Sequence, residues 1–332
     1  MRASKAFLLA SVMIAYPLGA SADGANPVDV TARPIANFLI GSDQRQFGRV
    51  TFKGGLEMVS RERHFGAISA VEIDDDTAWL IADTGFWVRG RIDRDADGAP
   101  TGLSQLVFSE IKGAGGARFD EKWQVDAEGV AVNNDGDLLI SFERDHRIAK
   151  YRWSGGGLDY LREEVPPVPL PELRQNQGFE GIAIAPDTFS HAQAVVGVTE
   201  KSLDEAGNIM GFVNPTGPAN AYEFSVKRTD GYDVTDVGFL PDGDMLLLER
   251  RFNISQGISM RLRHIEGSTL TKGGTVDGRT LLEADMRYQI DNMEGLAITP
   301  IGDKLVRLTI VSDDNKSLLQ RSLLLEFELA LD

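Results

Sequence analysis

The sequence predicts an all-β protein, a β-propeller in which five repeats can be counted. Three observations predict it: a short acidic phrase recurs along the chain, apolar runs and tight-turn residues follow each copy, and helical periodicity is nearly absent. The phrase reads "DAEGVAVNNDGD" from Asp126, "NQGFEGIAIAPD" from Asn176 and "DNMEGLAITPIGD" from Asp291. Self-similarity at a nearly fixed interval is typical of a repeat architecture.

Two further copies complete the series. A fourth, "DVTDVGFLPDGDMLLLER", has Asp236 in the place of the glutamate, and a degenerate first copy has Ala67 there. The five positions are 61, 52, 56 and 58 residues apart (67→128→180→236→294). We considered a repeating sandwich, but each unit is too small for a two-sheet core of its own. Strands in groups of about four at this interval favour propeller blades.

The strands within each repeat follow from turn residues between apolar runs. "GVAV" precedes "NNDGD" and "LLISFE", and "DVGFL" precedes "PDGD" and "MLLLER". Asp and Gly tolerate the backbone angles of tight hairpins, so each pair predicts two antiparallel strands. Alternating patterns at Arg147–Trp153 and Met260–Ile265 predict strands farther from the channel.

The last repeat, ending in "SLLLEFELA", shows only three strands. We expect Arg49–Ser60, "RVTFKGGLEMVS", to supply the missing outer strand and so close the ring. Five blades is the direct count. A sixth blade, built from other N-terminal strands, stays open.

The first 22 residues predict a signal peptide. "MRASK" is a basic n-region, "AFLLASVMIAYPLGA" an apolar h-region, and "ASA" at Ala20–Ala22 a cleavage site. We therefore expect a mature chain of residues 23–332, folded as one propeller domain and located in the periplasm or secreted. The apolar run is short for a membrane anchor, and no later stretch is long enough to span a bilayer.

Charge and composition narrow the partners. The formal net charge is −16, and it becomes −18 when Arg2 and Lys5 are removed with the signal peptide. Such a chain repels phosphate backbones, so we expect no nucleic-acid partner. Cysteine is absent, which excludes disulfides and thiolate metal sites. Hard divalent cations are the ions that fit.

Propeller topology predicts an acidic end of the channel. The start of an innermost strand and the end of its antiparallel neighbour lie at the same face. First strands are predicted to begin at Glu128, Glu180, Asp236 and Glu294. Second strands are predicted to end at Asp83, Glu143, Glu200, Glu249 and Asp313. Carboxylates about 4 Å apart repel by ~4 kcal/mol at an effective dielectric of ~20. Oxygen-rich coordination of calcium would offset this repulsion, although salt bridges within each blade remain an alternative.

A second calcium candidate is "DRDADGAPTGLS", residues 93–104. Asp93, Asp95 and Asp97 alternate ahead of Gly98, like the start of a calcium-binding loop. Its twelfth position is Ser104 rather than Glu, so a polar hairpin is the alternative.

The order of these motifs resembles the bacterial "esterase-like activity of phytase" family, the phytase-like propellers. The resemblance rests on D-x-E-G before an inner strand, E or E-R after the next strand, and the closing N-M-E-G, and it covers roughly residues 54–329. It implies hydrolysis of phosphoester or ester bonds in the cell envelope. The first copy departs from the pattern at Ala67.

Neither G-x-S-x-G nor H-E-x-x-H occurs, so we expect metal-assisted chemistry. In that reading, calcium orients the substrate, a carboxylate such as Glu128 or Glu180 positions water, His146 is a candidate base, and Arg250 holds an anionic group. We expect a monomer acting on a small anionic or ester substrate. A lactonase-like hydrolase is a close variant. A non-catalytic envelope propeller that binds a sugar, peptide or protein is the alternative of another class.

Overall fold

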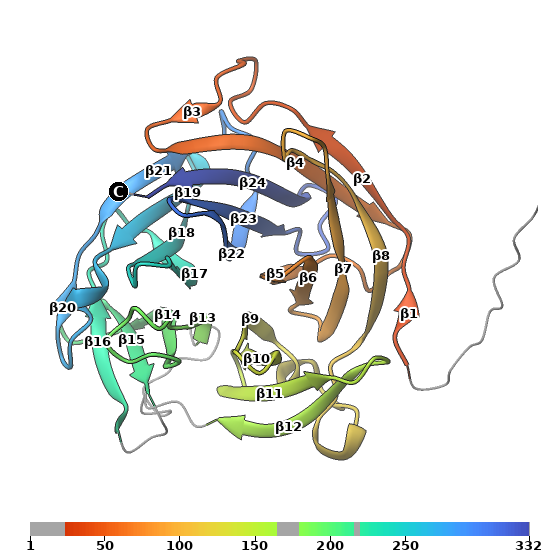
Figure 1. Cartoon of the computed structure of the whole chain (residues 1–332), viewed down its shortest axis with the longest axis horizontal. Coiled ribbons are helices and arrows are strands. Elements are labelled where there is room, and N and C mark those ends of the chain that lie inside the picture. Colours follow the sequence, from red (N-terminus) through yellow and green to blue (C-terminus); the bar gives the residue numbers. More distant parts are fainter. Residues whose placement is uncertain (1–23, 165–178, 216–219, 332) are drawn as a thin grey trace, which may run out of the picture.

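The structure, a computed structural model, describes residues 24–164, 179–215 and 220–331. Within these residues, five antiparallel blades surround a central channel (Figure 1). The prediction of a propeller is confirmed, and the number of blades is five. The predicted signal peptide, residues 1–22, lies outside the described residues.

The first three blades follow one another along the chain. Blade 1 consists of β5 (Ile68–Asp74), β6 (Thr77–Ala82), β7 (Phe86–Arg94) and β8 (Pro100–Glu110), with the short β1 (Asn26–Pro27) beside β8. Blade 2 consists of β9 (Ala127–Val132), β10 (Asp137–Phe142), β11 (Arg147–Trp153) and β12 (Leu158–Glu164). Blade 3 consists of β13 (Phe179–Ile184), β14 (Val195–Leu203), β15 (Ile209–Asn214) and β16 (Tyr222–Val226), and β20 (Thr275–Val276) pairs in parallel with β16.

The last two blades meet where the ring closes. Blade 4 consists of β17 (Asp233–Phe239), β18 (Met245–Asn253), β19 (Gly257–Ile265) and β21 (Arg279–Ala284). Blade 5 consists of β22 (Asn292–Gly302), β23 (Leu305–Asp313) and β24 (Ser322–Ala330), followed outward by β4 (Val50–Ser60) and β2 (Val30–Ile35), with β3 (Gln46–Phe47) beside β4. Three short 3-10 helices are described: η1 (Ala114–Gly116), η2 (Lys122–Gln124) and η5 (Gly267–Thr269).

Closure of the ring joins the two ends of the chain. β4 pairs antiparallel with β24, from Met58 opposite Ser322 to Val50 opposite Leu329. The prediction that the segment 49–60 completes the last blade is therefore confirmed. β2 adds a further outer strand that the repeat pattern did not predict.

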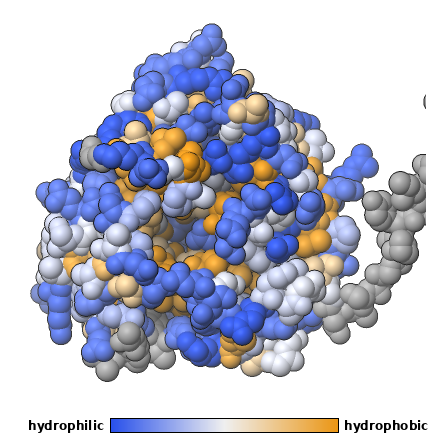
Figure 2. Space-filling view, viewed as in Figure 1, coloured by the Kyte–Doolittle hydropathy of each residue, from blue (hydrophilic) through white to orange (hydrophobic). Residues whose placement is uncertain are grey.

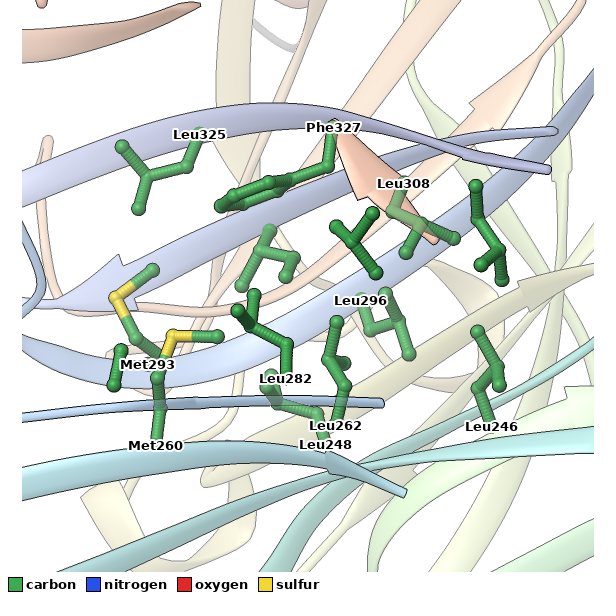
Figure 3. Close-up of a cluster of buried hydrophobic side chains, with 14 of the residues drawn as sticks. Leu246, Leu248, Met260, Leu262, Leu282, Met293, Leu296, Leu308, Leu325 and Phe327 are labelled. Carbon is green, nitrogen blue, oxygen red and sulfur yellow. The ribbon is translucent and has the colours of Figure 1, made fainter. Parts of the chain in front are cut away.

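The core lies between the blades. In the cluster between blades 4 and 5, the buried Leu246, Leu248 and Leu262 face Leu296 and Leu308 (Figure 3). Successive side chains of a strand point to opposite faces, so each sheet packs against both of its neighbours. This packing fixes the inner strands, and with them any side chain at the ends of the channel. In the described part of the chain, no helix has the length and apolar character needed to cross a bilayer.

Candidate functional site

Each inner strand bulges near its beginning. At each bulge one residue has no partner on the second strand, as between the pairs Ala127–Phe142 and Gly129–Ser141, where Glu128 is left out. The five unpartnered residues are Ser69, Glu128, Glu180, Thr235 and Glu294. They lie where the inner strands begin and the second strands end, and we call this end of the channel the mouth.

The glutamates of blades 2, 3 and 5 occupy equivalent positions at the mouth, as the repeat predicted. In blade 4 the equivalent residue is Thr235, so our alignment of Asp236 was one residue out. Asp236 Oδ1 accepts a hydrogen bond from Val237 N at 2.8 Å, and Oδ2 accepts one from Leu296 N at 2.6 Å. Both oxygens thus serve the backbone. In blade 1 the equivalent residue is Ser69, two positions after Ala67.

The second strands show the same one-residue offset in blade 4. In each blade, one pair of residues precedes the bulge of the inner strand, as Ala127–Phe142 does in blade 2. The residues that follow this pair on the second strands are Asp83, Glu143, Glu200, Arg250 and Asp313. Glu249, predicted at the mouth, instead lies fully buried inside blade 4. Its two oxygens lie 2.6 Å from Arg261 Nε and 2.6 Å from Arg263 Nη2. Blade 4 therefore contributes an arginine to the mouth where the other blades contribute acids.

We call Glu128, Glu180 and Glu294 the ring glutamates. Glycine follows each of them because the next blade approaches closely. A Cβ atom on Gly129 would lie 2.4 Å from the backbone oxygen of Glu180. A Cβ atom on Gly181 would lie 2.5 Å from Val237 N. Such distances are too short for any side chain, so the Glu-Gly pair couples a carboxylate at the mouth to tight contact between blades.

Hydroxyl groups of the preceding blade hold the backbone around these glutamates. Ser69 Oγ donates to Ala127 O at 2.6 Å, just before Glu128. The equivalent Thr235 Oγ1 donates to Met293 O at 3.1 Å, just before Glu294. Ser141 Oγ lies 3.2 Å from the backbone oxygen of Glu180 itself. The backbone at the ring glutamates is thus held by hydroxyl groups of the preceding blade and by close contact with the next blade.

Two groups of three carboxylates at the mouth have ligand atoms within 4.8 Å of one another. They are Asp126, Glu128 and Glu143, and Glu143, Glu180 and Glu200. Glu143 belongs to both groups, so it links blades 2 and 3. Sequence reasoning missed Asp126, which lies two positions before Glu128, as Asn292 lies two positions before Glu294.

Basic side chains balance part of this charge. Arg250 Nη2 lies 3.2 Å from Glu200, and Nη1 lies 3.8 Å from Glu294 and donates to Asn292 Oδ1. Arg144 Nε lies 2.7 Å from Asp126 Oδ2. The Arg144–Asp126 pair is a salt bridge within one blade, as in the alternative that we kept, whereas Arg250 joins acids of two other blades.

Several carboxyl groups at the mouth have raised pKa values. Burial, together with the nearby Asp313 carboxylate, raises the pKa of Glu294 to about 8, and Arg250 opposes this shift. Burial raises the pKa of Asp313 to about 7. Burial and the neighbouring glutamates raise the pKa values of Glu128 and Glu180 well above the usual range. Without a cation, part of the mouth is therefore protonated at neutral pH.

Two other predicted features are placed as follows. His146 is half-buried in the turn after Glu143, and burial lowers its pKa. Asp93, Asp95 and Asp97 lie at the β7–β8 hairpin, at the face opposite the mouth. Asp95 Oδ1 accepts hydrogen bonds from Asp97 N and Ala99 N at 3.0 and 2.9 Å. The loop thus has the geometry of a polar hairpin, and among the described residues it forms no group of three carboxylates within 4.8 Å.

The mouth fits a hard divalent cation. Its donors are carboxylate oxygens, which calcium prefers, and the buried Asp83 Oδ1 has no hydrogen-bond partner among the described residues. The pKa values of these carboxyl groups are raised mainly by burial and also by their acidic neighbours, and a bound cation would favour their charged form. The residues present therefore suit calcium. Glu143 would be a ligand in whichever of the two carboxylate groups holds the ion.

The model of a protein family matches residues 63–316, and its description is phytase-like, esterase-like activity of phytase. The chain belongs to this family. The match begins two residues before Phe65 and includes every mouth residue of the phytase-like propeller. None of the curated proteins matches the chain.

Solved structures similar to this phytase-like propeller are distant in sequence. A virginiamycin B lyase from Staphylococcus aureus, in a catalytically inactive form with quinupristin, is 12% identical over 92% of this chain and 100% of that chain, with a TM-score of 0.42. Myxococcus xanthus glutaminyl cyclase is 12% identical over 80% and 92%, with a TM-score of 0.42. A putative 6-phosphogluconolactonase from Bacteroides uniformis is 12% identical over 93% and 97%, with a TM-score of 0.40. At this distance no chemistry is transferred from them.

Proposed function

We propose that this chain is an exported hydrolase of phosphoester or carboxylate-ester bonds, which uses calcium at the mouth of the channel. The observation that carries the proposal is the pair of carboxylate groups that share Glu143, beside the one arginine that blade 4 contributes. Membership of the phytase-like family supports ester-bond chemistry.

The chain's own residues would divide the work at the mouth. Calcium, held by either carboxylate group, would supply Lewis-acid polarisation of a phosphoryl or carbonyl oxygen. Arg250 is 27% exposed and has N–H donors beyond its contacts with Asn292 and Glu200, so it would hold an anionic substrate group. When a bound cation keeps them deprotonated, Glu128 or Glu180 would accept a proton from water.

His146 remains a second candidate for the base. It follows Glu143 by three residues, and because burial lowers its pKa, its imidazole is neutral and able to accept a proton at neutral pH. Replacement with Asn would separate the two assignments. Loss of the acidic limb of the pH–rate profile, where the rate rises as the base loses its proton, in Glu180→Gln but not in His146→Asn would assign the base to the carboxylate.

The test is hydrolysis of p-nitrophenyl phosphate and p-nitrophenyl acetate, with calcium and with EDTA. We expect a rate that depends on calcium and that Glu143→Gln abolishes, because both carboxylate groups lose a charged ligand. Glu57→Gln is the matched control, since Glu57 pairs with Arg33 on the outer strands of blade 5. Calcium binding without hydrolysis of either ester class would favour a binding propeller instead.

Export is the second part of the proposal, and it rests on the signal-peptide pattern. We expect the mature protein to begin at Asp23. Mass spectrometry of protein from the envelope fraction checks this, and a chain that retains residues 1–22 there would contradict it.

A further inference from the structure

Toward the end of the channel opposite the mouth lies a cavity of about 380 Å³, which the hydrolase proposal does not use. All five inner strands line it. Val130, Ile182 and Leu296, each two residues after a ring glutamate, form its upper wall. Toward the opposite face the lining continues with Val132, Ile184, Phe239 and Ile298. We call this cavity the chamber.

The chamber is lined mainly by hydrophobic side chains, and polar atoms of its lining residues are also exposed to it. Figure 2 looks along the axis of the ring and shows a central hollow in which hydrophobic residues are visible. Ile184, Phe239 and Ile298 are only partly buried, so they offer apolar surface to whatever enters. Apolar cavities of roughly 300–1,000 Å³ with a few polar groups are typical small-molecule sites.

One carboxyl group faces this apolar wall. Glu72, on β5, lines the chamber, and its Oε1 accepts a hydrogen bond from Ile73 N at 2.8 Å. This leaves Oε2 available among the described residues. Burial raises the pKa of Glu72 to about 8, so at neutral pH the group is mostly protonated and can donate a hydrogen bond. Asp236, nearby, has both oxygens bonded to backbone N–H groups.

The lining of the chamber limits the kinds of molecule that could bind there. Glu72 in the wall and the exposed Asp187 at the rim are the two carboxyl groups of the described lining, and two carboxyl groups do not supply the six or more oxygen ligands that calcium takes. A strongly charged anion would meet no cationic side chain among the lining residues and would lie near the exposed Asp187 at the rim. An uncharged ligand with a hydrogen-bond acceptor meets neither obstacle.

We propose that the chamber is a binding site for a small, uncharged, largely apolar molecule with a carbonyl or ether oxygen, which accepts a hydrogen bond from Glu72. The site is separate from the mouth in position and in chemistry. It does not depend on the proposed hydrolase activity. Binding is therefore measured directly, on the full mature chain.

Titration with prodan, an uncharged naphthalene ketone whose emission shifts to the blue in apolar surroundings, tests the proposal. We expect saturable binding of one molecule per chain. Ile184→Trp should fill the chamber and weaken binding at least about tenfold. Ile301→Trp is the matched control, because Ile301 lies in the adjacent β22–β23 hairpin but does not line the chamber. It should bind prodan like the natural sequence.

The hydrogen bond has its own test. Glu72→Leu should weaken binding about fivefold, the weight of one hydrogen bond, and shift the bound emission further to the blue. Glu143→Gln, at the mouth, should leave prodan binding unchanged. If Ile184→Trp does not fold, Val132→Phe fills the same space from blade 2. Unchanged affinity in the folded filling variant, or no saturable binding by the natural sequence, would overturn the proposal.

Discussion

Arg250 Nη2 lies 3.2 Å from Glu200 Oε1, so a cation from blade 4 meets an acid from blade 3 at the mouth. Arg250 also lies 3.8 Å from Glu294 of blade 5. A single arginine therefore bridges three blades, and it opposes any cation bound by the neighbouring carboxylates.

Replacement of Arg250 should change stability and calcium affinity in opposite directions. In Arg250→Met we expect the calcium-free protein to lose about 1–3 kcal/mol, because partly buried carboxylates lose their partner. Calcium should bind more tightly, since the repulsion from the guanidinium is removed. Urea unfolding in EDTA and calorimetric titration measure the two effects, with Arg251→Met as the control. Weaker calcium binding in Arg250→Met would show that the arginine supports the site instead of opposing it.

Glu143 should matter more for calcium binding than any other mouth residue. Glu128→Gln and Glu180→Gln each alter one carboxylate group, whereas Glu143→Gln alters both. We therefore expect the largest loss of affinity for Glu143→Gln and non-additive losses in double variants. Calorimetric titration decides this, and equal affinities in all three single variants would remove the shared site.

The stability of the calcium-free protein should fall as pH rises. The pKa of Glu294 is raised from 4.5 to about 8 and that of Asp313 from 3.8 to about 7. Between these limits the folded chain binds more protons than the unfolded chain, so the stabilisation is complete below about pH 4 and is lost as pH rises through 7 to 8.

Melting temperatures in EDTA at pH 5.5 and pH 8.0 check this sign. Calcium should reduce the difference, because it replaces the protons and its affinity rises with pH. Glu294→Gln removes one of the titrating groups and should flatten the dependence. A melting temperature in EDTA that rises from pH 5.5 to 8.0 would contradict the assignment.

Glu249 should be a structural residue. Its carboxylate is fully buried between Arg261 and Arg263. Glu249→Gln leaves two guanidinium groups without their charged partner, and we expect a loss of about 3–5 kcal/mol. Calcium affinity of the folded variant should not change. Urea unfolding and calorimetric titration measure both, and a loss of calcium binding without a loss of stability would return Glu249 to the mouth.

Gly181 should tolerate no side chain. A Cβ atom there would lie 2.5 Å from Val237 N, on the neighbouring blade. Gly181→Ala should cost about 1–3 kcal/mol through overpacking and should also weaken calcium binding, since Glu180 is displaced. Gly156→Ala controls for the loss of a glycine alone, because nothing lies within 4 Å of its Cβ position and its φ is not in the left-handed region. Equal stability of Gly181→Ala and the natural sequence would contradict close contact between the blades.

The sequence predicted a propeller of five or six blades, the strand that closes the ring and three of the five residues at the bulges. Those predictions succeeded because Glu-Gly at a bulge leaves a clear pattern: the glutamate is left out of the pairing, and the glycine admits the next blade. Blade 4 has neither residue at these positions. Its apolar pattern fits two registers one residue apart, so only the pairing shows that Thr235 and Arg250 lie at the mouth.

Other features could not be predicted for a different reason. The contacts of Asp126 and Asn292 join residues of the same or adjacent blades across the mouth, and their distances depend on how the blades are rotated against one another. The short strand β20 precedes the outer strand of blade 4 in the chain but pairs with β16 of blade 3. It has two residues, too few for a recognisable strand pattern. Such features depend on how the blades pack, and the local sequence pattern of a single blade does not predict them.

The closure of blade 5 has a consequence for how the chain reaches its folded state. β4 begins at Val50, whereas its partner β24 begins at Ser322, 272 positions later (322 − 50). At synthesis rates of about 5–20 residues per second, β4 waits roughly 15–55 s for that partner. During this interval an apolar strand edge has no neighbour on one side, which invites association with other chains. Ring closure is thus a late, long-range step. Slower synthesis of β24 should increase aggregation more than slower synthesis of any blade that forms from consecutive strands.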